Sequence, residues 1–149
     1  MREKFTSDLK EAMKAGDKMR VATIRLIAAA LKDRDILARG EGKTVSDEDI
    51  LALLQKMVKS RQESFDIYEK NNRPELAAQE KGEIEVISTY LPAQMDEAAV
   101  TAAIKAAIAE TGAASMKDMG KVVGALKARY TGQMDFAKAS AAVKAALSG

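Results

Sequence analysis

The stretch Ser46-Asp47-Glu48-Asp49-Ile50-Leu51-Ala52-Leu53-Leu54 opens a long amphipathic pattern that sets the fold class of this chain. Ser46 is a favourable N-cap, and the three carboxylates after it suit the positive end of a helix. Apolar residues then recur every three or four positions on one stripe, namely Leu51, Leu54, Val58, Phe65 and Tyr68. The spacing predicts a long helix with one buried face. Arg61 falls inside the stripe, and we interpret it as an arginine whose stem packs while its head reaches solvent, rather than as a ligand contact.

Two helices are predicted before this one. The first covers residues 2–15 and ends at Gly16, a natural left-handed cap. Its expected buried face is Phe5, Leu9, Ala12 and Met13. The second starts at the N-cap Asp17 and ends at Gly40. Its expected buried face is Val21, Ile24, Ala28 and Leu31, and its expected outward residues are Arg25, Lys32 and Arg34.

One more helix is predicted in this first unit. Asn71-Asn72-Arg73-Pro74 breaks the long helix, and Pro74 suits the first turn of the next one. That helix runs towards Leu91-Pro92 with Leu76, Ile84 and Ile87 as its apolar positions. We interpret Tyr90-Leu91-Pro92 as a rigid hinge, so that residues 1–92 form an N-terminal helical domain and residues 93–149 a second domain.

The second domain carries signals for three short helices. Asp96 caps an Ala-rich helix that Gly112 closes, Ser115 caps the next, and Asp135 caps the third. No stretch alternates apolar and polar residues for long enough to suggest a sheet. The predicted fold class is all-α: an N-terminal helical bundle followed by a small three-helix C-terminal unit.

Composition limits the chemistry. The 149 residues include no Cys and no His, which excludes disulfides, thiol nucleophiles, His-based triads and most zinc sites. We therefore expect no metal and no cofactor. The start Met1-Arg2-Glu3-Lys4 fits neither a signal peptide nor a membrane span, so the chain is expected to be cytoplasmic without membrane contact.

Glu80, Glu83 and Glu85, with Tyr90 nearby, suggest an acid/base site, but we favour a solvated face of the helix.

The excess positive charge of the chain lies in its second domain. Residues 93–149 hold seven basic and five acidic side chains, which accounts for the whole net charge of +2. On a helical wheel started at Met119, the expected buried stripe is Val122, Val123, Leu126 and Tyr130. The flank and far side hold Lys117, Gly120, Lys121, Gly124 and Lys127.

The two glycines on this basic face admit two interpretations. A glycine within a helix costs about 0.5–1 kcal/mol relative to alanine, so two on one face need a compensation. In one interpretation, the spacing Gly120-Lys121-Val122-Val123-Gly124 lets a neighbouring helix approach closely. In the other, bare backbone between lysines lets a sugar–phosphate strand lie close, with cations to neutralise it.

Two strings carry a family resemblance. Glu83-Ile84-Glu85-Val86-Ile87-Ser88-Thr89-Tyr90-Leu91-Pro92-Ala93-Gln94 is followed by Gly112-Ala113-Ala114-Ser115-Met116-Lys117-Asp118-Met119-Gly120-Lys121-Val122-Val123. Together they resemble the GatB/YqeY family over essentially the whole chain, although the part from Ala125 onward is less distinctive. The resemblance implies a helical N-terminal domain and a C-terminal unit similar to the tail of the B subunit of the tRNA-dependent amidotransferase, which helps to hold tRNA.

The resemblance also limits what this chain is expected to do. The kinase-and-transfer core of the B subunit and the glutaminase of its partner subunit are both missing, so carbon–nitrogen ligase activity with glutamine as amide donor is not expected from the chain alone. Lys117, Gly120, Lys121 and Gly124 match the helix that the tail presents towards tRNA.

Three functions remain open at this point. The favoured prediction is a protein that binds tRNA, or docks on an amidotransferase or aminoacylation-related complex, without catalysis. Its predicted RNA-binding residues are the four matched positions together with Lys127 and Arg129, which the local charge adds. The first alternative is a helical adaptor that recognises a protein and never contacts RNA. The second is an enzyme that works through Glu80, Glu83 and Glu85.

Overall fold

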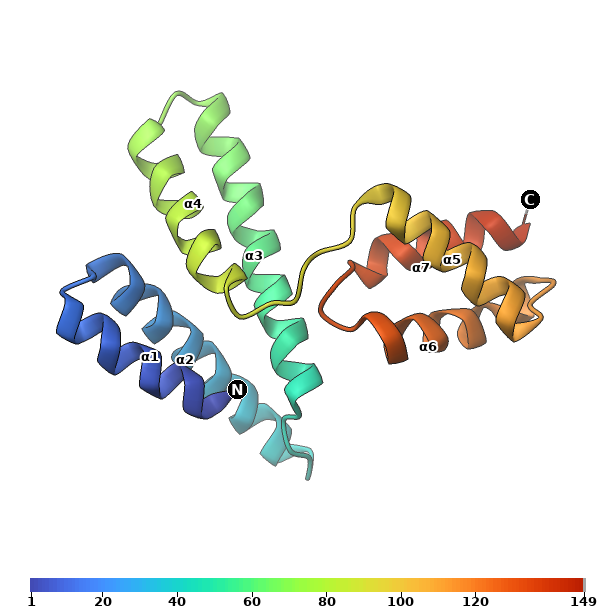
Figure 1. Cartoon of the computed structure of the whole chain (residues 1–149), viewed down its shortest axis with the longest axis horizontal. Helices are drawn as coiled ribbons and strands as arrows, with labels where there is room; N and C mark the ends of the chain where they lie inside the picture. The colour runs from blue at the N-terminus through green and yellow to red at the C-terminus, as the bar shows by residue number, and fades with distance from the viewer. Residues whose placement is uncertain (149) are drawn as a thin grey trace. The chain divides into compact units, whose positions relative to one another are not determined.

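The computed structural model describes residues 1–148 and contains helices without any strand among them. This confirms the all-α prediction. The chain divides into two compact units, Met1–Leu91 and Pro92–Gly149, each of which has its own hydrophobic core. They are called unit 1 and unit 2 below, and Figure 1 shows the helices of each.

Unit 1 contains four helices, α1 (Arg2–Ala15), α2 (Lys18–Gly40), α3 (Asp47–Lys70) and α4 (Pro74–Ser88). Figure 1 shows them as two helical hairpins, α1 with α2 and α3 with α4, and α2 also packs against α3 and α4.

The predicted helix ends of unit 1 are confirmed. Gly16 is left-handed at φ 68°, Asp17 accepts a hydrogen bond from the Arg20 backbone N–H, and Ser46 forms a full capping box with Asp49. Pro74 occupies the first turn of α4. These ends depend on neighbouring residues in the sequence, which is why local signals located them.

The core of unit 1 corrects several predicted faces. Its fully buried large side chains are Ile24, Ile27, Ile50, Leu54 and Ile87. On α3 the buried line is Ile50, Leu54 and Met57. Leu54 is buried as predicted, Ile50 and Met57 are buried in place of their neighbours Leu51 and Val58, and the other members of the predicted stripe are only half-buried. Met13, Ala28 and Leu76 were predicted to face inward and are exposed. Neighbouring positions on a helix lie about 100° apart, so a small rotation set by the packing partners exchanges a buried residue for an exposed one.

Arg61 also differs from its prediction. Its side chain is only 17% exposed, and its Nε lies 3.0 Å from Glu83 Oε2. Its Nη1 donates to the Met57 carbonyl oxygen at 3.1 Å. The head of Arg61 therefore lies in an ion pair between α3 and α4 rather than in solvent. Charged groups are rarely buried without a partner, and Glu83 provides the partner from a helix that the sequence of α3 does not reveal.

Tyr90 belongs to unit 1 and is not a hinge residue. Its ring packs edge-on against Phe5, with 4.7 Å between ring centroids, and its hydroxyl donates to Asp8 Oδ2 at 2.5 Å. Arg20 Nη2 lies 3.8 Å from the other oxygen of the same carboxylate. Tyr90 is buried in the core and ties the end of α4 to α1, so the hinge prediction is wrong at this residue.

Unit 2 contains α5 (Glu97–Thr111), a short 3₁₀ turn η1 (Met116–Asp118), α6 (Met119–Tyr130) and α7 (Phe136–Ser148). All three α-helices pack against one another. The core is built from mostly small side chains: Ala103, Ile104, Ala107, Val122, Leu126, Met134, Ala139 and Val143. Small residues at these positions allow short helices to approach closely, which suits a unit with so few aromatic residues.

The helix caps of unit 2 follow the prediction with one exception. Asp96 accepts from the Ala99 backbone N–H, Asp135 accepts from the Ala137 backbone N–H, and Gly112 is left-handed at φ 66°. Ser115 precedes η1, where it makes no side-chain capping bond. The carboxylate of Asp118 accepts a hydrogen bond from the Ala114 backbone N–H at 3.0 Å, in the loop before η1, and it makes no capping bond to α6 either.

Candidate nucleic-acid interface

The six predicted RNA-binding residues lie on one short segment of unit 2. Lys117 belongs to η1, and Gly120, Lys121, Gly124, Lys127 and Arg129 belong to α6. All six are exposed. The buried side of α6 is formed by Val122 and Leu126, with Met119, Val123 and Tyr130 packed against the same core, as the helical wheel predicted. The six exposed residues are called the α6 face below.

The surroundings of the two glycines of the α6 face test one of the two earlier interpretations, the close approach of a neighbouring helix. A Cβ atom built on Gly120 or on Gly124 meets nothing within 4 Å. Neither has the positive φ that would require glycine for its backbone conformation. Within the described residues, no neighbouring helix approaches either glycine, so the prediction of close helix packing at these positions is wrong for this chain. The glycines instead leave a stretch of helix backbone open to solvent.

Two carboxylates reduce the positive charge of the α6 face. Lys121 Nζ lies 3.9 Å from Asp118 Oδ1, and Arg129 Nη2 lies 2.5 Å from Glu110 Oε2. The hydrogen bond from Arg129 holds the pKa of Glu110 below its ordinary value, and the backbone N–H groups of Ala114 and Ser115 do the same for Asp118. Both carboxylates are therefore ionised at neutral pH, and they are part of the electrostatics of this face.

The sequence reasoning missed both counter-ions. Asp118 stands three residues before Lys121, a spacing that brings two side chains together on a helix, so this pair had a local signal. Glu110 lies on α5, and only the packing of α5 against α6 brings it to Arg129.

The carboxylate cluster of α4 does not form a converging site. Glu83 is buried and paired with Arg61, Glu80 is half-buried, and Glu85 is exposed. Burial, and next the negative charge of Glu83, raise the pKa of Glu80. The prediction of a solvated face is thus wrong for Glu83. The hydroxyl of Tyr90 is hydrogen-bonded to Asp8 on α1 and not to any of these three carboxylates.

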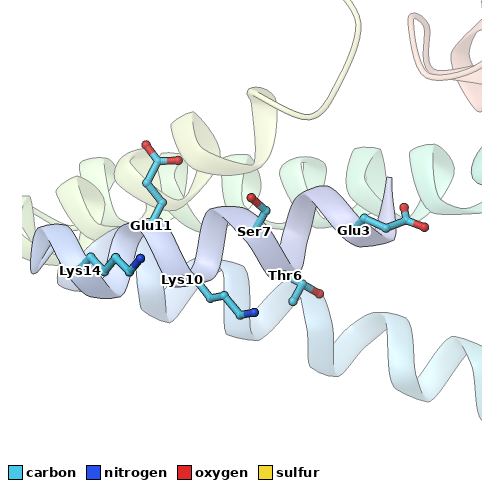
Figure 2. A pocket seen from close by; sticks show the side chains of 6 residues that line it. All are labelled: Glu3, Thr6, Ser7, Lys10, Glu11 and Lys14. Carbon is cyan, nitrogen blue, oxygen red and sulfur yellow. The ribbon is translucent and has the colours of Figure 1, made fainter.

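A shallow hollow of about 580 Å³ lies on α1. Glu3, Thr6, Ser7, Lys10, Glu11 and Lys14 line it. Figure 2 shows that their side chains spread in different directions along one helix, with Ser7 and Glu11 on one side and Thr6 and Lys10 on the other. No hydrogen bond or ion pair joins any two of these six described side chains, whereas a nucleophile and its base lie within hydrogen-bond reach of each other.

The described residues offer neither a metal-binding cluster nor a helix that could cross a membrane. The described residues contain no group of three or more carboxylate, His or Cys side chains placed to hold a metal ion. None of the helices in residues 1–148 combines the length and the apolar character that crossing a membrane requires.

These features define the class: an all-α protein with a helical bundle, a separate three-helix unit and an exposed basic helix. The chain matches the family model described as "Yqey-like protein" over residues 2–147 and therefore belongs to the YqeY-like family. The match confirms the family predicted from the two sequence strings.

Curated relatives are found in yeasts. The chain is 38% identical over 84 residues to the "Altered inheritance of mitochondria protein 41, mitochondrial" of Lachancea thermotolerans. The matched segment covers 56% of this chain and 44% of that protein. It is 32% identical over 84 residues to the protein of the same name from Saccharomyces cerevisiae strain YJM789, with the same coverage. The matched segment thus covers less than half the length of these relatives. Their names place them in mitochondria, whereas the cytoplasmic location of this chain stays a prediction.

Proposed function

We propose that unit 2 binds tRNA through the α6 face, and that the protein acts as a non-catalytic accessory to an amidotransferase or a related aminoacylation complex. The family match supports this proposal because the resemblance relates unit 2 to a tRNA-holding tail. Under the proposal the chain contributes binding, and the ligase chemistry belongs to another protein.

One observation carries the proposal: open helix backbone lies among exposed lysines. Gly120 and Gly124 meet no atom within 4 Å of an added Cβ, and Lys117, Lys121 and Lys127 are exposed on the same segment. A phosphate backbone that lies against bare helix gains contact with peptide groups, while lysines replace its counterions. The two glycines weaken the helix without helping its packing, so an external ligand explains them best.

The electrostatics predict moderate rather than tight binding. Lys121 and Arg129 are already paired with Asp118 and Glu110. RNA phosphates must therefore replace these carboxylates as partners of the two cations. Both pairs lie at the surface, although Asp118 is half-buried, and surface ion pairs contribute little to stability, so the exchange costs little free energy. Lys117 and Lys127 carry no ion pair in the part of the chain that the structure describes, and they are available for phosphate at once.

The first test is tRNA binding at two salt concentrations, with the variant Lys117→Ala/Lys121→Ala. Binding that weakens with salt, and whose salt dependence falls by about two phosphate contacts in the variant, supports the proposal. The matched control is Lys105→Ala/Lys138→Ala, which removes the same charge from exposed positions of α5 and α7. The control should keep nearly all of the affinity.

The adaptor alternative makes the opposite prediction. If the purified protein does not bind tRNA at low salt, the α6 face is not an RNA interface. Equal losses in the variant and in the control would mean that only net charge matters, which also contradicts a specific face.

A further inference from the structure

An exposed apolar face of unit 1 lies on α2, on the side of the helix away from the core. Its exposed apolar residues are Met19, Ala22, Leu26, Ala29, Ile36 and Leu37. The first four follow one another at steps of three and four, and Asp33 occupies the next such position before Ile36. Leu26 is 41% exposed, Ile36 56% and Leu37 63%, which is unusual for large aliphatic side chains. This set is called the α2 seam below. It spans about 27 Å at 1.5 Å per residue.

The seam is separate from the buried face of the same helix. Ile24, Ile27 and Leu31 face the core of unit 1, and at 100° per residue they lie roughly opposite the centre of the seam. Met19 is the one seam residue at the border, because its side chain lies against Gly82 of α4. A surface helix needs only one apolar stripe to join a core, so a second stripe of three turns or more calls for another explanation.

A row of cations runs along one edge of the seam at a spacing of seven residues. The row consists of Lys18, Arg25, Lys32 and Arg39, and all four are exposed. Across the described residues, none of the four lies in an ion pair with a carboxylate. Seven residues is close to two helical turns, so the row stays beside the seam along its whole length.

A hollow of about 400 Å³ opens beside the first part of this row. It is lined by Met13, Gly16, Lys18, Val21, Ala22 and Arg25. Met13, at 54% exposure, borders it from α1. The hollow thus combines apolar walls with two cations, and it joins the seam at Ala22.

We propose that the α2 seam binds an amphipathic helix of a partner protein, one whose apolar stripe is flanked by Asp or Glu at heptad spacing. The heptad repeat is the pattern by which one helix recognises another, and the apolar residues at alternate three- and four-residue steps correspond to its a and d positions. The cation row corresponds to a flanking position, where opposite charge selects the partner. This proposal does not depend on RNA binding by unit 2.

The composition of the seam favours a helix over a membrane surface. Ala22 and Ala29 alternate with larger residues, and small side chains let a helix backbone approach closely. A helix that inserts into a membrane interface depends on bulky Leu, Phe and Trp instead. Asp33 lies in the centre of the seam and is exposed. A parallel second copy of α2 would place this carboxylate against itself, and an antiparallel copy would place the two cation rows together, so the charges disfavour self-pairing.

The test uses two synthetic helical peptides of about three heptads with the same Leu and Ala seam. One carries Glu at both flanking positions and the other carries Lys, so that either helix orientation is covered. We expect the full-length protein to bind the Glu peptide with a Kd of about 10 µM and the Lys peptide far more weakly. Fluorescence anisotropy of the labelled peptides provides the measurement.

Two variants test the α2 seam, and a third is their matched control. Lys18→Glu/Arg25→Glu/Lys32→Glu should weaken binding of the Glu peptide at least about tenfold. The same variant should bind the Lys peptide more tightly than the unchanged protein does. Leu26→Asp/Ile36→Asp should remove binding of both peptides with an unchanged helical circular dichroism spectrum, because both side chains are exposed. Lys10→Glu/Lys14→Glu/Lys56→Glu is the matched control, since it makes the same charge change at exposed positions of α1 and α3.

Several outcomes overturn the proposal. One is the absence of Glu-peptide binding at about 100 µM, and another is an equal loss in the control variant, which would indicate charge alone. Sedimentation that shows a dimer lost in Leu26→Asp/Ile36→Asp would assign the seam to a second copy of the chain. Binding to phosphatidylserine vesicles without peptide binding would assign it to a membrane surface.

Discussion

Unit 1 and unit 2 place their charged and apolar groups in opposite ways. Unit 1 buries the Arg61–Glu83 ion pair between α3 and α4, and it exposes the large apolar side chains of α2. Unit 2 has a core of Ala, Ile, Val, Leu and Met, while its pairs Lys121–Asp118 and Arg129–Glu110 lie at the surface. A buried pair holds helices together, whereas a surface pair exchanges easily for a ligand.

The difference separates the two interfaces that we propose. In unit 2 the groups available for exchange are charged and surround bare backbone, which suits a phosphate chain. In unit 1 the exposed groups are apolar with cations at one edge, which suits another helix. Lysines are present on both faces, so the side chains between the lysines, and not the charge itself, separate the two.

The largest expected effect comes from breaking the buried pair of unit 1. Glu83→Ala should destabilise unit 1 by about 3 kcal/mol, because it leaves the Arg61 guanidinium buried without its partner. Hydrogen exchange with peptide mass spectrometry follows each unit separately, and unit 2 should be unchanged. The matched control Glu85→Ala, at an exposed position of α4, should cost no more than about 0.5 kcal/mol. Arg61→Met/Glu83→Leu should recover most of the stability, and a failure to recover would mean that packing, not charge, dominates there.

The next effect tests the polar contact between α1 and α4, and it depends on pH. Tyr90→Phe should cost unit 1 about 1.5 kcal/mol at neutral pH, since the hydroxyl hydrogen bond to the Asp8 carboxylate is lost. Burial, and then the bond to Asp8, raise the pKa of Tyr90 above its ordinary value of 10.0. The folded state therefore holds the phenolic proton more tightly than the unfolded state.

That shift sets the direction of the pH dependence. The stabilisation from Tyr90 should be complete below the unfolded pKa of about 10 and decline as the pH rises through that value towards the folded pKa. Urea unfolding of the protein and of Tyr90→Phe at pH 8 and pH 10.5 measures the difference. The two proteins should become more alike at the higher pH, and a constant difference would contradict the role given to the hydroxyl.

A smaller effect of opposite sign is expected in unit 2. Gly120→Ala/Gly124→Ala should stabilise unit 2 by about 0.5–1 kcal/mol for each substitution, because both methyl groups enter open space on a helix. The same variant should bind tRNA several-fold less tightly, since the added methyl groups hold the phosphate backbone away. Thermal unfolding and tRNA titration of one preparation measure both. A gain in stability with unchanged tRNA binding would show that bare backbone is not used.

The smallest effect tests the exchange of surface pairs. Glu110→Gln removes the carboxylate that holds Arg129 and should raise tRNA affinity by a few-fold, with no measurable change in the unfolding of unit 2. The control is Glu97→Gln on the same helix, which changes the charge equally at an exposed position. Equal gains in both variants would mean that Arg129 is not part of the interface.

The α6 face shows how much of the candidate site could be predicted from the sequence. The helical wheel separated Val122 and Leu126 from the exposed residues because one amphipathic helix has a single period. It left open whether the glycines pack against a helix, since that depends on the positions of α5 and α7. Only the packed unit shows that both glycines face open space. The same packing brings Glu110 to Arg129, which the order of residues along the chain did not reveal.

The sequence by itself determined the helices, their caps and the family, because capping and periodicity act between residues a few positions apart. Asp17, Ser46, Asp96 and Gly112 all have the cap roles that their neighbours predict. The tertiary structure alone decided which positions of α3 are buried and which charges from different helices meet. The Arg61–Glu83 pair and the exposed α2 seam depend on how helices far apart in the sequence are rotated against each other, and no local pattern encodes that rotation.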